Sequence, residues 1–229
     1  KVRSGSVNLN FQVLGFKSFE RAIQSPAKEI PTQNWIRSMS EDEVFWDIGA
    51  NVGLMSLLAA AQGCHVVAFE PEPRNYENLV KNLRLVQGKC TLLPLQVGLA
   101  SAMGIYVIPD SRLKHAGTST SFISGQSSAI GSQVGHMGIA ISPSQALELL
   151  PSPLNTPTHI KIDTDGDEFQ VLEGLSAVLA SHSVRSLMVE ATSDLERTIS
   201  SLLNPHGFEL CGVESTRGRT DVDLFFERR

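Results

Sequence analysis

Short apolar runs alternate with longer amphipathic segments from residue 44 to the end of the chain. The short runs predict buried strands, and the segments with apolar residues on one face predict helices. Strands that alternate with helices predict a parallel sheet covered by helices on both faces. The predicted strands are residues 44–48, 65–69, 91–97, 105–108, 159–162, 184–189, 208–213 and 222–227, and the predicted helices are residues 54–62, 74–85, 168–180 and 193–203.

The last two predicted strands have no helix between them. The turn-like stretch 214–221 joins them, which predicts an antiparallel hairpin. The expected fold class is therefore α/β, a Rossmann-like, doubly wound and mostly parallel seven-stranded sheet with a C-terminal β-hairpin.

Two segments stand outside this alternation. Residues 1–43 contain amphipathic pieces around 11–23 and 32–39, interrupted by Pro26 and Pro31. They predict a helical N-terminal cap on the main domain, residues 44–229. Residues 110–138 are rich in Gly and Ser. Because a structureless connection of that length is unusual in a compact domain, we expect a loop or lid insertion there.

Composition narrows the class of partner. A net charge of −5 and a pI of about 5.7 give no support to nucleic-acid binding, which needs clustered Lys and Arg. No apolar run approaches the roughly 18 residues of a membrane span, and no signal-peptide pattern is present. The three cysteines have no C-x-x-C spacing, which argues against a disulfide framework or a zinc site. We therefore expect a cytoplasmic protein, and its oligomeric state is not indicated.

The strongest local signal is the segment Val44-Phe-Trp-Asp-Ile-Gly-Ala-Asn-Val-Gly53. An apolar strand ends at Asp47, and ligands of open α/β sheets bind outside the carboxyl ends of the strands. Gly49 and Gly53 let the backbone approach a ligand where a Cβ would collide. Asn51 stands where the dinucleotide motif G-x-G-x-x-G has its second glycine, so no pyrophosphate site is indicated. Asp47 suits a ligand that carries an ammonium group.

A second acidic residue follows the next predicted strand. Glu70 ends the run Val66-Val-Ala-Phe-Glu-Pro71, 23 residues after Asp47 (70 − 47 = 23). An acidic residue at about this offset hydrogen-bonds the ribose hydroxyls of an adenosine-containing cofactor. The two signals together favour S-adenosylmethionine, which has both an ammonium group and an adenosine, over a nucleotide or a purely structural role.

Three blocks in order resemble motifs of the FkbM family of methyltransferases. Residues 47–53 look like the family's D-[VI]-G-A-N-x-G, and residues 68–73 look like its A-F-E-P-x-P. Residues 159–168, His-Ile-Lys-Ile-Asp-Thr-Asp-Gly-Asp-Glu, are similar to L-K-I-D-V-E-G-x-E. The resemblance covers about residues 44–190. Asp165 replaces the family's usual Glu in the third block.

This resemblance implies the class I methyltransferase fold and S-adenosylmethionine-dependent methyl transfer, with S-adenosylhomocysteine as product. The implied acceptor is a small molecule, most often a hydroxyl of a sugar or secondary metabolite. The expected cofactor-binding residues are Asp47, Gly49, Ala50, Asn51, Gly53, Glu70, Pro71 and Gly98.

A hydroxyl acceptor must lose its proton as it attacks, and a carboxylate or histidine can accept that proton. Asp163, at the carboxyl end of a predicted core strand, is the first candidate for this role. Glu190, at the end of the next strand, is the second, and His115 in the Gly/Ser-rich segment is the third. Asp163 could instead cap the following helix or pair with Lys161.

Other functions stay open at this point. The acceptor could be a nitrogen atom, or the chain could bind the cofactor without turnover. We expect no metal ion, although the carboxylates of residues 163–168 could hold Mg²⁺ in a metal-assisted reaction.

Overall fold

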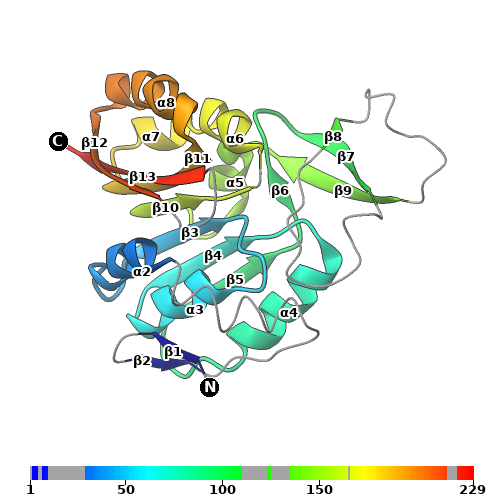
Figure 1. Cartoon of the computed structure of the whole chain (residues 1–229). Coiled ribbons are helices and arrows are strands. Elements are labelled where there is room, and N and C mark those ends of the chain that lie inside the picture. The colour runs from blue at the N-terminus through cyan, green and yellow to red at the C-terminus, as the bar shows by residue number, and fades with distance from the viewer. Residues whose placement is uncertain are drawn as a thin grey trace.

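The computed structural model describes residues 2–4, 7–9, 29–109, 123–124, 135–164, 166–215 and 221–229. Its centre is a seven-stranded sheet (Figure 1). The strands are β3 (Val44–Ile48), β4 (His65–Phe69), β5 (Leu92–Leu95), β10 (His159–Ile162), β11 (Ser186–Thr192), β12 (Phe208–Ser215) and β13 (Asp221–Arg228). They lie in the order β12-β13-β11-β10-β3-β4-β5.

The strand directions confirm the expected fold class. Strands β5, β4, β3, β10 and β11 are parallel, and β13 is antiparallel to both of its neighbours, β11 and β12. From β3 the chain builds β4 and β5 on one side and later returns to place β10 on the other. The strand order therefore reverses between β3 and β10. In open α/β sheets, ligands bind at such a switch point.

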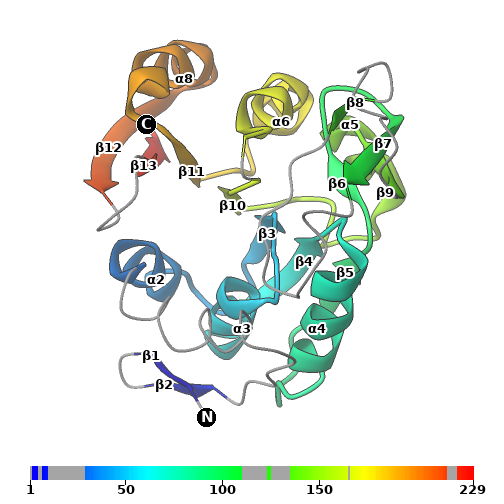
Figure 2. The same ribbon diagram turned by 45° about the vertical axis from the view of Figure 1, so that its right-hand side comes forward.

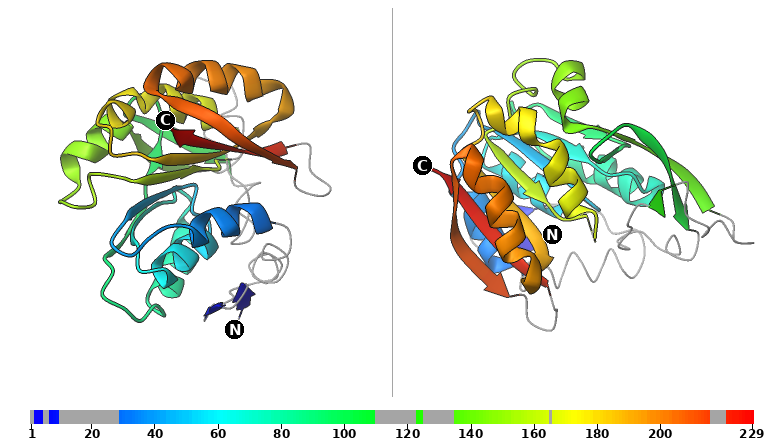
Figure 3. Two further views of the ribbon diagram at one scale, coloured as in Figure 1. Left: turned by 90° about the vertical axis from the view of Figure 1, so that its left-hand side faces the viewer. Right: turned by 90° about the horizontal axis from the view of Figure 1, so that it is seen from above.

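Alternate residues of β3 enter the two hydrophobic layers of the molecule. Trp46 packs with helices above one face of the sheet, and Phe45 packs with helices below the other. Figures 1 and 3 show these two helical layers. One layer holds α5 (Pro143–Leu149), α6 (Glu168–Gly174), α7 (Ser176–Ala180) and α8 (Glu196–Leu203), and the other holds α2 (Ile30–Arg37), α3 (Leu54–Ala61) and α4 (Pro73–Leu83).

Helix α5 was not anticipated from the sequence, although its start carries a strong local signal. Ser142 accepts a hydrogen bond from the backbone N–H of Gln145, whose side chain accepts from the N–H of Ser142 in return. Pro143 occupies the first turn, where its missing N–H costs nothing. This capping box fixes the start of α5.

A smaller four-stranded sheet lies beside β5 (Figure 2). It consists of β6 (Gly98–Leu99), β7 (Gly104–Pro109), β8 (Ile123–Ser124) and β9 (Gly135–Ile141) in the order β6-β9-β7-β8. The strand predicted at 105–108 thus belongs to this sheet. Both β8 and the start of β9 lie inside residues 110–138, so this segment contains secondary structure that the loop prediction did not include.

The N-terminal segment differs from the all-helical prediction. Strands β1 (Val2–Ser4) and β2 (Val7–Leu9) form a two-stranded antiparallel sheet. Helix α2 lies where the amphipathic piece before β3 predicted a helix, with Ile36 fully buried. The other predicted piece, around 11–23, lies outside the described residues. Within the part of the chain that the structure describes, no helix has the length and apolar character needed to cross a membrane.

Candidate functional site

The turn after β3 lies against the end of β10. The backbone N–H groups of Gly49 and Ala50 both donate to the carbonyl of Phe69 in β4, at 3.0 and 3.1 Å. Gly49 has φ +79°, and a Cβ built there would lie 1.8 Å from the carbonyl oxygen of Asp163. Asn51 also adopts a left-handed conformation, which Asn tolerates better than most residues. The sequence of the turn therefore follows from its close contact with the chain after β10.

Glu70 fixes this turn to the end of β4. Its carboxylate accepts the N–H of Asn51 at 2.7 Å and the N–H of Glu72 at 2.9 Å, and only 3% of the residue is exposed. Burial raises the pKa of Glu70 to about 7, and the two backbone hydrogen bonds oppose that rise. Glu70 is therefore a group that changes charge near neutral pH.

Two hollows open on either side of the Gly49 turn. The first cavity, of about 400 Å³, is lined by Ile48, Gly49, Asn51, Phe69, Glu70, Pro71, Gly98, Leu99, Asp163 and Thr164. The second cavity, of about 350 Å³, is lined by Glu29, Asp47, Gly49, Ala50, Asn51, Val52, Leu54, Met55, Lys161 and Asp163. The two share three lining residues, so they lie side by side at the switch point, with the Gly49 turn between them.

Asp47 lies beneath the turn, and 1% of it is exposed. Its Oδ2 accepts a hydrogen bond from the Ser56 hydroxyl at 2.6 Å, whereas its buried Oδ1 has no hydrogen-bond partner. Burial raises the pKa of Asp47, and the nearby Lys161 ammonium opposes this rise. A buried carboxylate oxygen that makes no hydrogen bond, on a residue lining a cavity, suits a cationic hydrogen-bond donor.

Asp163 lines both cavities and is paired with Lys161. The Lys161 ammonium lies 2.8 Å from Asp163 Oδ2 and 3.6 Å from Asp47 Oδ1. Of the two structural alternatives for Asp163, the ion pair is present, and the N-cap of α6 is Asp167. Lys161 was not among the predicted site residues. The available signal is a Lys between the two isoleucines of the buried strand His159–Ile162, because a lysine is rarely buried without a partner.

The other predicted residues take different places. Pro71 and Gly98 line the first cavity and Ala50 the second, whereas Gly53 begins α3 and packs against Leu79. Glu190 is buried on β11, opposite Asp223 of β13, and is not among the lining residues of either cavity. His115 lies outside the described residues. Among those that are described, no three His, Cys, Asp or Glu side chains are grouped to hold a metal ion.

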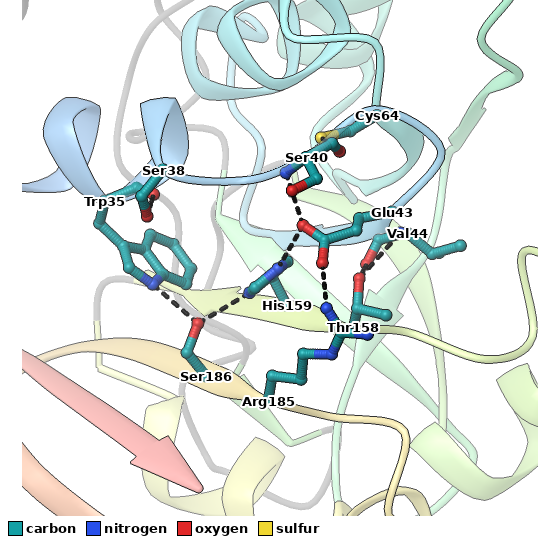
Figure 4. Close-up of polar contacts among 10 residues, drawn as sticks. All are labelled: Trp35, Ser38, Ser40, Glu43, Val44, Cys64, Thr158, His159, Arg185 and Ser186. Carbon is teal, nitrogen blue, oxygen red and sulfur yellow. Dashed lines mark hydrogen bonds and ion pairs between the residues drawn. The ribbon is translucent and has the colours of Figure 1, made fainter.

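A polar network lies at the amino ends of β10 and β11, away from the cavities at the carboxyl ends of the strands. Figure 4 shows its contacts. Trp35 of α2 donates its indole N–H to the Ser186 hydroxyl at 2.8 Å, and that hydroxyl lies 2.8 Å from His159 Nδ1. His159 Nε2 lies 3.0 Å from Glu43, which also pairs with Arg185.

The order Ser–His–Glu in this network resembles a nucleophilic relay, but its environment is structural. Ser186 is 5% exposed, and its hydroxyl accepts the hydrogen bond of the Trp35 indole N–H. Burial lowers the pKa of His159, so the imidazole is neutral at pH 7. The network joins α2 to strands β10 and β11.

The residues at the switch point fit S-adenosylmethionine. Asp47 Oδ1, which makes no hydrogen bond and has the Lys161 ammonium 3.6 Å away, suits the ammonium of the methionine half, and Glu70 on the first cavity suits the two ribose hydroxyls. Gly49 provides a turn without a Cβ between the two. These three features lie in two adjacent cavities at the carboxyl ends of neighbouring strands.

Comparisons with known proteins agree on the class. The model of the methyltransferase FkbM domain family matches residues 47–210. Hexuronic acid methyltransferase AglP of Haloferax volcanii is 29% identical over 196 residues, which cover 85% of this chain and 74% of that protein.

Solved structures resemble the fold. Magnesium protoporphyrin IX methyltransferase (ChlM) from Synechocystis PCC 6803 with bound SAM gives a TM-score of 0.55 at 12% identity, covering 96% of this chain and 87% of that chain. Precorrin-6y C5,15-methyltransferase from Geobacter metallireducens GS-15 gives 0.51 at 16% identity, covering 88% of each chain. With the family match spanning most of the domain, the chain belongs to the FkbM methyltransferase family and is an S-adenosylmethionine-dependent methyltransferase.

Proposed function

We propose that this methyltransferase methylates a hydroxyl group of a sugar or a similar small molecule, with Asp163 as the proton acceptor. The observation that carries this proposal is the place of Asp163, which lines both cavities and contacts the Gly49 turn through its carbonyl. The relative AglP, a hexuronic acid methyltransferase, supports a sugar acceptor.

The residues around the switch point divide the work. S-adenosylmethionine supplies an already activated methyl group, so the protein mainly has to position the acceptor and exclude water. Glu70 would hold the ribose and Asp47 the ammonium of the donor. Asp163, kept ionised by Lys161, would receive the proton of the acceptor hydroxyl.

Cofactor binding is tested first, by calorimetric titration with S-adenosylmethionine and S-adenosylhomocysteine. We expect Glu70→Ala to abolish binding, because the ribose hydroxyls lose their acceptor. Glu77→Ala is the matched control, since Glu77 is an exposed glutamate of α4 whose only described partner is Lys81. Equal loss of binding in both variants would show that Glu70 has no specific role.

Acceptor chemistry is tested with methyl-labelled donor and a panel of hexuronic acid glycans, neutral sugars and simple amines. Asp163→Asn should lower kcat for the preferred hydroxyl acceptor by about 10²-fold or more. Asp194→Asn, at an exposed carboxylate, is the control, and Glu190→Gln tests the second candidate. Wild-type turnover by Asp163→Asn would exclude Asp163 as the proton acceptor. Cofactor binding without turnover of any acceptor would instead favour a non-catalytic cofactor-binding module.

A further inference from the structure

Lys161 of β10 places a buried positive charge near two carboxylates of the candidate site. It is the third residue of β10, and 5% of its side chain is exposed. A buried ammonium is stable only where carboxylates or other acceptors surround it. One of these carboxylates is Asp47 of β3, the candidate partner of the donor ammonium. The other is Asp163, the candidate proton acceptor.

The surroundings of Lys161 are strongly acidic. Asp47, Asp163 and Glu29 line the second cavity with it, and Lys161 is the one cationic side chain among the described lining residues. Glu190 on β11 and Asp223 on β13 point to the same face of the sheet as Lys161. They are paired with each other, and Glu190 lies two residues after Met188, the residue of β11 that pairs with Lys161. Asp47 and Asp163 thus share one cation within an acidic environment.

The protonation state of Lys161 excludes a role as a base. Burial alone would lower its pKa, but the carboxylates of Asp163 and Asp47 raise the pKa above the ordinary value for lysine. The two carboxylates therefore favour the ammonium form of the side chain. It acts as a fixed charge.

We propose that Lys161 is a positioning residue that keeps Asp47 and Asp163 ionised at the same time and so joins donor binding to proton acceptance. The proposal rests on the function proposed for Asp163. Asp47 is buried, and the Asp163 side chain is 22% exposed. Two carboxylates this close to one ammonium disfavour each other's ionised form, so that without the cation the pKa of at least one of them rises. Protonation of either one is harmful, because Asp47 then binds the donor ammonium less well or Asp163 cannot accept the acceptor proton.

The first experiment needs no substitution. Carbon-detected NMR of aspartate carboxyl groups in the wild-type protein, with Asp47→Asn and Asp163→Asn used for assignment, gives the titration of each residue. We expect both carboxylates to stay ionised from pH 8 down to below pH 6 in the presence of S-adenosylhomocysteine. Titration of either one above pH 6 overturns the proposal, even if methyl transfer itself is established.

The second experiment removes the charge. Lys161→Met keeps an unbranched chain without the ammonium, and Lys161→Arg keeps the charge. We expect Lys161→Met to shift the acidic limb of kcat/KM to higher pH and to weaken S-adenosylmethionine binding about tenfold at pH 7, with recovery at pH 9. Lys161→Arg should keep the wild-type limb. Adding Asp47→Asn to Lys161→Met should return the limb towards the wild-type position, because Asp163 then has no neighbouring carboxylate at Asp47 to raise its pKa.

A purely structural role gives a different pattern. Lys161→Met would then lower stability and activity by the same factor at every pH and leave the acidic limb in place, which overturns the proposal. If Lys161→Met does not fold, the wild-type NMR titration still decides it. Failure of the proposed function gives a different result, because turnover is then absent although both aspartates stay ionised down to below pH 6.

Discussion

At Gly49 the turn after β3 lies close against the chain after β10. A Cβ at this position would lie 1.8 Å from the carbonyl oxygen of Asp163, and the left-handed conformation adds about 1–2 kcal/mol of strain for any other residue. We therefore expect Gly49→Ala to push the turn away from β10 and to weaken S-adenosylmethionine binding by at least about tenfold, which corresponds to 1.4 kcal/mol.

Calorimetry, together with the melting temperature, checks this expectation. Gly88→Ala is the matched control because its Cβ would meet only the Cys90 sulfur, at 3.9 Å. Unchanged affinity in Gly49→Ala would mean that the turn can move aside without disturbing the cofactor site.

Glu70 predicts a pH-dependent affinity for the cofactor. Its pKa of about 7 means that the carboxylate loses its proton between pH 6 and pH 8. Ribose hydroxyls donate hydrogen bonds, and a carboxylate accepts them better than a carboxylic acid does. S-adenosylhomocysteine should therefore bind about tenfold more tightly at pH 8 than at pH 6. Titration of Glu70→Gln should give weak binding without this pH dependence, and a flat wild-type profile would contradict the argument.

At this scale the sequence predicts positions better than it predicts partners. Asp47, Gly49 and Glu70 can be found because strand ends, glycines and acidic residues at fixed offsets are local features. The pairing of Lys161 with Asp163, two residues later, can be read from the sequence, whereas its contact with Asp47 cannot, because β3 and β10 meet only in the fold. Only the fold shows that these carboxylates lie on both sides of one ammonium.

Helix α6 packs closely against α5 and the turn after β6. A Cβ on Gly174 would lie 2.8 Å from Pro143 Cδ and 3.2 Å from the carbonyl oxygen of Ala100. In an exposed helix, Gly→Ala stabilises by about 1 kcal/mol, but overpacking a tight contact costs about 1–3 kcal/mol. We expect Gly174→Ala to lower the free energy of unfolding and, because β6 carries Gly98 of the first cavity, to weaken cofactor binding.

Urea unfolding with a double-mutant cycle tests this contact. Pro143→Ala removes Cδ, so the variant with both substitutions should be more stable than the sum of the single effects predicts. If Gly174→Ala stabilises the protein, the helix can shift without cost and the close approach has no energetic importance.

The elements of the main sheet follow from the sequence because each is a short apolar run bounded by polar turns. The smaller sheet does not, since β6 has only two residues and β9 begins in the Gly/Ser-rich segment. Their pairing joins residues far apart in the chain, such as Gly98 with Ala140. The capping box at Ser142 can be read from the sequence, but the seven residues of α5 are too few to show a helical repeat of apolar positions.

For the whole molecule, the groups at the two ends of the parallel strands change stability with pH in opposite directions. Burial lowers the pKa of His159 from 6.5, so its contribution to stability is present above that value and is lost as the pH falls. Burial raises the pKa of Glu70 from 4.5 to about 7, so its contribution is greatest below pH 4.5 and is lost as the pH rises through 7. A rise of this size corresponds to about 3 kcal/mol for a buried group.

These opposite signs predict how two variants differ from the wild type in urea unfolding without ligand between pH 5 and pH 8. The deficit of His159→Gln should be largest at pH 8 and should shrink towards pH 5, because protonation then destabilises only the wild type. Relative to the wild type, Glu70→Gln should gain stability from pH 5 to pH 8, because only the wild type ionises a buried carboxylate. Differences that stay constant with pH would rule out this linkage. The ionised carboxylate of Glu70 thus lowers stability at the pH at which we expect it to bind ribose hydroxyls, and the network around His159 contributes most to stability in the same range.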